Sequence, residues 1–245
     1  MLGKAACVEE LHWLAVVRHG LSTGNVTAQE AEESGAESID IPERDADVPL
    51  APLGSEQAEA VGRLLRDDPP DLAVVSPYLR TRQTAELALA GSGVPMVVDE
   101  RLRDRELGVL DLLTARGVRA RLPDEARRRD RLGKFYYRPP GGESWADVLL
   151  RLRAVLREIR QDHPRGRVVL FAHEATVLMV RYLAEGLSEG ELMELAHRTT
   201  VANCSISSWR GTAAGLEPEL FNSVAHLKQE DVPHTRQEDV NAEPV

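Results

Sequence analysis

Residues 14–25 read LAVVRHGLSTGN, and this stretch decides how the rest of the chain is interpreted. Leu14 to Val17 form an uninterrupted apolar run, which is typical of a strand buried on both faces. The run ends in Arg18 and His19, and a loop of small and polar residues follows. In open α/β sheets, ligands collect at the carboxyl ends of the strands. The stretch therefore predicts a strand that leads directly into a binding site.

Three further apolar runs are followed by polar side chains in the same way. Helical segments alternate with these runs, which is typical of a three-layer α/β/α fold with a mainly parallel central sheet. Because the carboxyl ends of parallel strands share one edge of the sheet, we expect these polar side chains to face one crevice. The runs and the residues that follow them are 71–75 with Ser76 and Arg80, 94–98 with Asp104 and Glu106, and 167–172 with His173.

Other segments are interpreted from their periodicity and charge. Apolar residues recur at helical spacing over 145–159, which predicts the clearest helix of the chain. Residues 26–48 hold eight acids and one arginine without a clear period, so we expect a surface excursion, either the edge of a lid or a solvated loop. Residues 112–138 hold nine basic residues and three acids. They predict either a helical lid that attracts anionic substrates or solvated helix faces.

The composition limits the classes of function. The net charge of −10 argues against extensive nucleic-acid binding, because phosphate contacts need a basic surface. Cys7 and Cys204 have no metal-ligand spacing and predict free thiols in a reducing cytoplasm. No apolar run approaches the roughly 18 residues of a membrane span, and the first residues make a poor signal peptide. We expect a cytoplasmic protein with one catalytic domain over 1–227 and a polar, disordered tail over 228–245.

The side chains expected at the crevice suit a phosphoryl group. Arginine guanidinium groups match phosphate oxygens bidentately, and a helix N-terminus beside Arg80 adds oriented N–H groups. A neutral histidine attacks phosphorus to form a phosphoramidate, and an acid protonates the departing oxygen. The chain contains neither a nucleotide phosphate loop nor a zinc or calcium motif. We therefore expect a small phosphorylated substrate and no metal or other cofactor.

Six ordered motifs between about Leu14 and Ser208 resemble those of the histidine phosphatase superfamily, the phosphoglycerate mutase-like group. The motifs are VVRHGLSTGN, PLAPLGSEQA, VSPYLRTRQTA, RLRDRELG, PPGGES and VVLFAHEATV. The stretch FYYRPPGGES is most similar to a phosphatase-like branch of that superfamily. The resemblance implies the same three-layer fold, and chemistry that needs no cofactor.

The resemblance also implies a role for each matching residue. His19 corresponds to the nucleophile that becomes phosphorylated. The register of the motif assigns the general acid to Asp104, with Glu106 as the alternative acid and otherwise a substrate contact. Glu174 departs from the family pattern, in which many members carry glycine after the second histidine. We expect its carboxylate to point away from the phosphate or to orient a neighbour. The residues implied to bind the phosphoryl group or to line its pocket are Arg18, Arg80, His173, Ser22 and Asn25.

Three functions are compatible with these motifs. A metal-independent phosphomonoester phosphatase acting through a phosphohistidine is favoured, because only about 35 residues separate Gly108 from Glu143. Dedicated mutases of the family carry a longer insertion at this place. The alternatives are a phosphoglycerate-type mutase and a catalytically inactive module that binds phosphorylated ligands. The first predicts phosphate release, the second dependence on a bisphosphorylated primer, and the third binding without a phosphohistidine.

Overall fold

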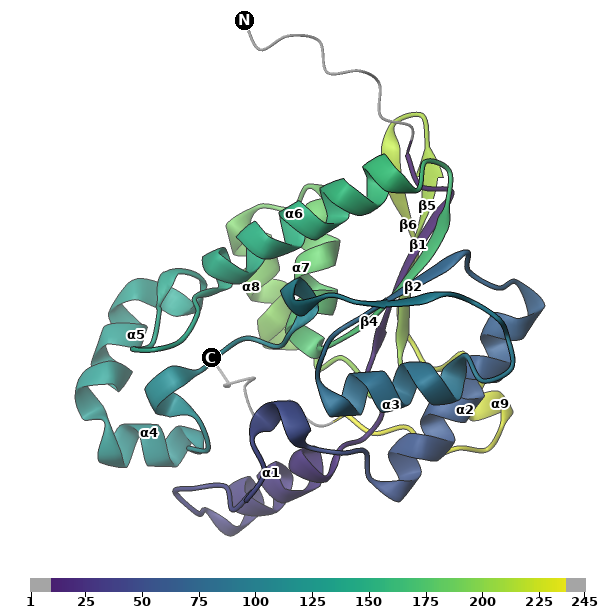
Figure 1. Ribbon diagram of the computed structural model, residues 1–245. Coiled ribbons are helices and arrows are strands. Elements are labelled where there is room, and N and C mark those ends of the chain that lie inside the picture. Colours follow the sequence, from purple (N-terminus) through teal and green to yellow (C-terminus); the bar gives the residue numbers. More distant parts are fainter. Residues whose placement is uncertain (1–9, 237–245) are drawn as a thin grey trace, which may run out of the picture.

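Figure 1 shows the computed structural model of the protein, which describes residues 10–236. The strands are β1 (Trp13–Arg18), β2 (Leu72–Val75), β3 (Met96–Val98), β4 (Arg167–Ala172), β5 (Ile206–Thr212) and β6 (Gly215–Ser223). They form one sheet in the order β3-β2-β4-β1-β5-β6. The first four strands in this order pair in parallel, whereas β5 and β6 are antiparallel to their neighbours. The mainly parallel sheet confirms the fold class predicted from the sequence.

Helices cover both faces of the sheet. They are α1 (Thr23–Ser34), α2 (Pro52–Asp67), α3 (Leu79–Ala88), α4 (Ala115–Arg121), α5 (Pro123–Tyr136), α6 (Trp145–Asp162), α7 (Glu174–Glu185), α8 (Glu189–Arg198) and α9 (Ala225–Gln229). Because successive strand residues point to opposite faces, Leu14 and Val16 pack with α6 and α7. Ala15 and Val17 pack with α2 and α3 on the other face. These layers, visible in Figure 1, confirm the predicted three-layer architecture.

Residues 26–48, expected to form the edge of a lid or a solvated loop, contain most of helix α1. Ser22 Oγ accepts a hydrogen bond from Asn25 N at 3.0 Å, and Asn25 Oδ1 accepts one from Ser22 N at 3.1 Å. This capping box starts α1 within the quoted stretch. The helix buries few apolar side chains, among them Ala28 and Ala31, so its hydrophobic period is too weak to predict it. A single 3₁₀ turn, η1 (Asp45–Asp47), follows in the same stretch.

The basic segment 112–138 forms α4 and α5, on the left of Figure 1. Their inner faces pack Val118 and Ala126 into a small apolar cluster of their own. Several basic side chains of this segment have local acidic partners. The pairs are Arg121 with Glu37 at 3.0 Å, Arg138 with Asp147 at 3.6 Å, and Arg127 with Asp124. Substrate attraction by this segment stays a prediction, and these contacts lower the charge available for it.

The expectation of a disordered tail is wrong for residues 228–236. Residue 228 lies inside α9, and the chain beyond it packs Val232 against a cluster that contains Ala60 and Ala202. Asn203 N then donates a hydrogen bond to Thr235 O at 3.0 Å. Residues 237–245 lie outside the described part of the chain, as does Cys7 in the N-terminal lead-in. None of the helices within residues 10–236 has the length and apolar content needed to cross a membrane.

Two glycines let α2 approach the loop after β1. A Cβ atom on Gly54 would lie 2.1 Å from Leu21 O, and one on Gly20 would lie 2.4 Å from Gly54 O. We expect Gly54→Ala to lower the free energy of unfolding by about 3 kcal/mol, because backbone atoms must move apart to admit the methyl group. Urea denaturation measures this. Gly190→Ala is the matched control, since no atom lies within 4 Å of its Cβ position. Equal stabilities of the two variants would contradict the prediction.

Candidate active site

The carboxyl ends of β1 and β4 bring two histidines together. His19 follows β1 and His173 follows β4, and their ring centroids are 5.4 Å apart at an interplanar angle of 62°. Both residues are fully buried. His19 N donates to Ala172 O at 3.0 Å, so the parallel pairing of the two strands continues up to the histidines and sets their spacing.

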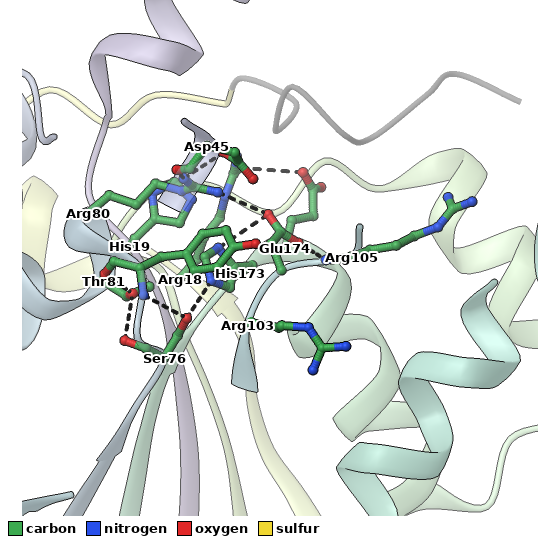
Figure 2. A network of polar contacts seen from close by, with 12 residues as sticks. Arg18, His19, Asp45, Ser76, Arg80, Thr81, Arg103, Arg105, His173 and Glu174 are labelled. Atoms are coloured by element: carbon green, nitrogen blue, oxygen red, sulfur yellow. Dashed lines mark hydrogen bonds and ion pairs between the residues drawn. The ribbon is translucent and has the colours of Figure 1, made fainter. Parts of the chain in front are cut away.

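An arginine and a carboxylate complete the centre of the site (Figure 2). Arg80, in the first turn of α3, donates from Nη2 to Asp104 Oδ2 at 3.3 Å. The same oxygen lies 3.3 Å from His173 Nδ1. His173 Nε2 is 2.8 Å from Ser76 Oγ at the end of β2. Both ring nitrogens of His173 therefore face a polar partner, which fixes the orientation of the ring.

The structure separates the two acids between which the motif left a choice. Asp104 is buried beside His173 and Arg80, whereas Glu106 is exposed and accepts a hydrogen bond from Tyr78 Oη at 3.1 Å. The Tyr78 ring lies edge-on to the His173 ring, with the centroids 5.1 Å apart. Burial, followed by the negative charges of nearby carboxylates, raises the pKa of Tyr78, so its hydroxyl acts as a hydrogen-bond donor at neutral pH.

Arg18 and Glu174, which adjoin His19 and His173 in the sequence, form a buried pair. Arg18 Nη1 lies 3.6 Å from Glu174 Oε2 and donates to Val201 O. Glu174 Oε1 accepts from Val201 N at 2.7 Å. The carboxylate also lies in the first turn of α7, where the helix dipole favours negative charge. Glu174 thus orients a neighbouring arginine, which is one of the two arrangements expected for it.

We expect removal of this buried carboxylate to destabilise the fold. Glu174→Ala removes a carboxylate that pairs with the buried Arg18 guanidinium, and breaking such a buried pair costs about 3–5 kcal/mol. Chemical denaturation measures the loss. Glu194→Ala removes an exposed partner of Arg198 and is expected to cost less than about 0.5 kcal/mol. Similar stabilities of both variants would show that the buried pair contributes nothing.

The predicted pocket residues Ser22 and Asn25 are buried and form the capping box of α1. Asn203 links them to the nucleophile loop, since its Nδ2 lies 3.4 Å from Asn25 Oδ1 and donates to His19 O at 3.2 Å. Asn203 Oδ1 in turn accepts from Thr235 Oγ1 at 2.9 Å. The C-terminal segment therefore supports the loop that carries His19, a contact that no sequence motif indicates.

Sequence reasoning also missed Asp45. The residue comes from the 3₁₀ turn η1, and both its carbonyl oxygen and its Oδ1 accept from Arg80 Nη1, at 2.7 and 2.8 Å. Tyr78 was passed over as well, although it stands in the quoted motif VSPYLRTRQTA, whereas Ser76 was expected at the crevice without a partner. Their polar groups reach His173 and Glu106, which becomes visible only when the strands are assembled.

The family assignment follows from the sequence as a whole. A family model described as the histidine phosphatase superfamily (branch 1) matches residues 14–224. The chain belongs to the histidine phosphatase superfamily. It is therefore an enzyme of the phosphatase or mutase type, and the juxtaposed histidines and arginines occupy the carboxyl edge of its sheet.

Relatives of this histidine phosphatase superfamily member carry both kinds of name. A probable phosphoglycerate mutase of Yersinia enterocolitica is 28% identical over 221 residues, covering 86% of this chain and 93% of the relative. The 2,3-bisphosphoglycerate-dependent phosphoglycerate mutase 2 of Gloeobacter violaceus is 32% identical, over 77% of this chain and 84% of its own.

Solved structures of superfamily members include phosphatases. A mycobacterial glucosyl-3-phosphoglycerate phosphatase complexed with VO3 has a TM-score of 0.68 at 25% identity, covering 86% of this chain and 99% of its own. A protein described as mycobacterial hydrolase 1 has a TM-score of 0.70 at 27% identity, covering 87% and 99%. The comparisons thus agree on the superfamily. They do not distinguish a phosphatase from a mutase, because both kinds of enzyme are among the similar proteins.

Proposed function

We propose that the protein is a metal-independent phosphomonoester phosphatase that forms a phosphohistidine on His19. The observation that carries the proposal is the meeting of His19 and His173 at one buried point with Arg80 and Asp104. This group of side chains supplies a nucleophile, cationic partners for phosphoryl oxygens, and a proton donor. The substrate class proposed is a small phosphorylated metabolite.

The tautomer of His19 supports its role as nucleophile. Its Nδ1 lies 2.8 Å from Gly20 O, and a carbonyl oxygen only accepts hydrogen bonds. Nδ1 therefore carries the proton, and the lone pair of the neutral ring is on Nε2. In the proposed first step, Nε2 forms a bond to phosphorus while the bond from phosphorus to the leaving oxygen breaks. Arg80, Arg18 and His173 stabilise the phosphoryl oxygens in this step.

Asp104 is the proposed general acid. Its Oδ2 lies 3.3 Å from both Arg80 Nη2 and His173 Nδ1, so it adjoins two groups that hold the phosphoryl oxygens. From there it donates a proton to the departing alkoxide. In the second step the resulting carboxylate takes a proton from water, which attacks phosphorus and breaks the bond to Nε2. Free phosphate leaves, and both residues return to their starting states.

The segment that follows the proposed general acid is short. Its length favours hydrolysis of the phosphohistidine over transfer of the phosphoryl group back to the substrate, as in a mutase. Val109 N donates to Pro140 O at 3.0 Å, and Glu143 N donates to Glu106 O at 2.8 Å. These bonds join the two ends of the segment that contains α4 and α5. A mutase must exclude water while its intermediate reorients, and dedicated mutases of the family use a longer insertion to do so. The mutase stays the second candidate, because the curated relatives described above carry that name.

Product analysis in the presence of a chelator tests the proposal. The substrates are p-nitrophenyl phosphate and 3-phosphoglycerate, the latter with and without 2,3-bisphosphoglycerate. We expect phosphate release that needs neither metal nor primer. Conversion of 3- to 2-phosphoglycerate that depends on the primer and exceeds phosphate release would indicate a mutase. Binding of phosphate without turnover of any substrate would indicate a binding module.

A further inference from the structure

We propose that Asp45 is a specificity-determining residue that selects against phosphomonoesters with a negatively charged leaving group. With Glu106, it favours a leaving group that carries an ammonium group. The inference rests on the proposed phosphatase function, and it assigns the charge of the part of the substrate that lies beyond the phosphate.

The first argument is the contact between Asp45 and the phosphate-binding arginine. Its carbonyl oxygen and Oδ1 lie 2.7 and 2.8 Å from Arg80 Nη1 and both accept hydrogen bonds from it. The Arg80 side chain is 4% exposed and that of Asp45 is 24% exposed. The carboxylate therefore contacts the buried Arg80 and is itself partly open to solvent.

A second carboxylate adjoins the same place from another segment. The Arg80 guanidinium lies 4.9 Å from the centroid of the Tyr78 ring, and Tyr78 Oη donates to Glu106 Oε1 at 3.1 Å. The negative charges of Asp45, Asp104 and Glu106 all contribute to the raised pKa of Tyr78, after burial as the largest cause. Asp45 and Glu106, distant in sequence, thus flank Tyr78 at the outer side of Arg80.

Arg103 and Arg105, the two arginines on either side of Asp104, bond to Glu143. Arg103 Nη2 donates to Glu143 Oε1 at 2.7 Å, and Arg105 Nε donates to Glu143 O at 2.7 Å. Figure 2 shows both side chains turned away from Asp45 and Arg80. Asp111 lies near both carboxylates, because Asp45 and Glu106 contribute, after burial as the first cause, to the raised pKa of its carboxyl group. The outer side of the site is therefore acidic, although its centre binds an anion.

We expect this arrangement to select substrates by the charge of the leaving group, the alcohol part of the phosphomonoester. The phosphoryl oxygens face Arg80 and the histidines, so the alcohol part extends outward, towards Asp45 and Glu106. A carboxylate there meets like charges in a partly desolvated site, whereas an ammonium group meets opposite charges. Phosphoglycerates carry such a carboxylate, and so the inference separates this chain from a phosphoglycerate-specific enzyme.

Two compounds on the same two-carbon frame test the inference. 2-Aminoethyl phosphate ends in an ammonium group and 2-phosphoglycolate in a carboxylate. We expect kcat/KM of the wild type to be about tenfold higher for the first, and this ratio to fall as salt is added. Asp45→Asn keeps an oxygen acceptor for Arg80 Nη1 and removes the charge, and is expected to lower the ratio about fivefold. Asp162→Asn, an exposed acid at the end of α6, is the matched control and leaves the ratio unchanged.

A wild-type ratio near one, or a preference for phosphoglycolate, would overturn the inference. So would an unchanged ratio in the double variant Asp45→Asn with Glu106→Gln. Failure of the proposed function is recognised separately, since p-nitrophenyl phosphate would then not be hydrolysed in a His19-dependent manner. In that event, calorimetric affinities of the same two compounds for the His19→Ala variant give the ratio without turnover and decide the question in the same way.

Discussion

His19→Ala is expected to abolish the hydrolysis of p-nitrophenyl phosphate, with kcat falling by at least about 10⁴-fold. Nε2 of His19 is the proposed atom that bonds to phosphorus, and alanine offers no lone pair in its place. His173 cannot take over, because its Nε2 faces Ser76 Oγ at 2.8 Å and its Nδ1 faces Asp104 at 3.3 Å. Steady-state release of p-nitrophenol measures the loss.

The covalent intermediate distinguishes loss of the nucleophile from loss of structure. Wild-type protein quenched in alkali during turnover is expected to carry an acid-labile phosphoryl group, detectable by intact-mass spectrometry, whereas His19→Ala carries none. His163→Ala changes an exposed histidine at the end of α6 and serves as the control, with unchanged kcat. A phosphorylated His19→Ala protein would show that the nucleophile is a different residue.

The residues at the strand ends of the site are predictable from the sequence. The apolar runs identify the strands, and the geometry of a parallel sheet places the ends of those strands together. Buried apolar runs identify β1, β2 and β4, and their parallel pairing brings their carboxyl ends to one edge. His19 and His173 follow those strands directly, so their proximity follows from the sequence once a parallel sheet is assumed. The superfamily motifs add the roles of these residues, which periodicity alone does not indicate.

Some contacts of the site could not be predicted from the sequence, namely those of Asp45, Glu174 and Thr235. The contact of Asp45 with Arg80 depends on how a single 3₁₀ turn docks, and such a turn has no hydrophobic period. Glu174 pairs with an arginine from another strand end, and that pairing depends on rotamers within a packed interior. Thr235 reaches the nucleophile loop through Asn203, from a segment whose polar composition predicted disorder. Each is a contact between segments that are distant in the sequence. The packing of the folded chain positions its polar groups, so local sequence patterns do not predict it.

Asp104→Asn is expected to slow hydrolysis in a manner that depends on the leaving group. For an alkyl phosphate such as glycerol 1-phosphate, we expect kcat to fall by about 10²- to 10⁴-fold, because an alkoxide needs a proton in order to depart. p-Nitrophenyl phosphate should lose far less, since p-nitrophenolate is a stable anion that leaves unprotonated. Measuring kcat for both substrates separates a lost proton donor from general damage to the site, which would slow both equally.

Glu106→Gln is the matched control and decides between the two acids of the motif. Glu106 is exposed and bonded to Tyr78 Oη, whereas Asp104 is buried within 3.3 Å of both Arg80 and His173. We therefore expect Glu106→Gln to leave the ratio of the two kcat values, alkyl against aryl, within about threefold of the wild type. If Glu106→Gln shows the loss that depends on the leaving group and Asp104→Asn does not, Glu106 is the proton donor. The loop must then shift when substrate binds, because only a displaced Glu106 would reach the leaving oxygen.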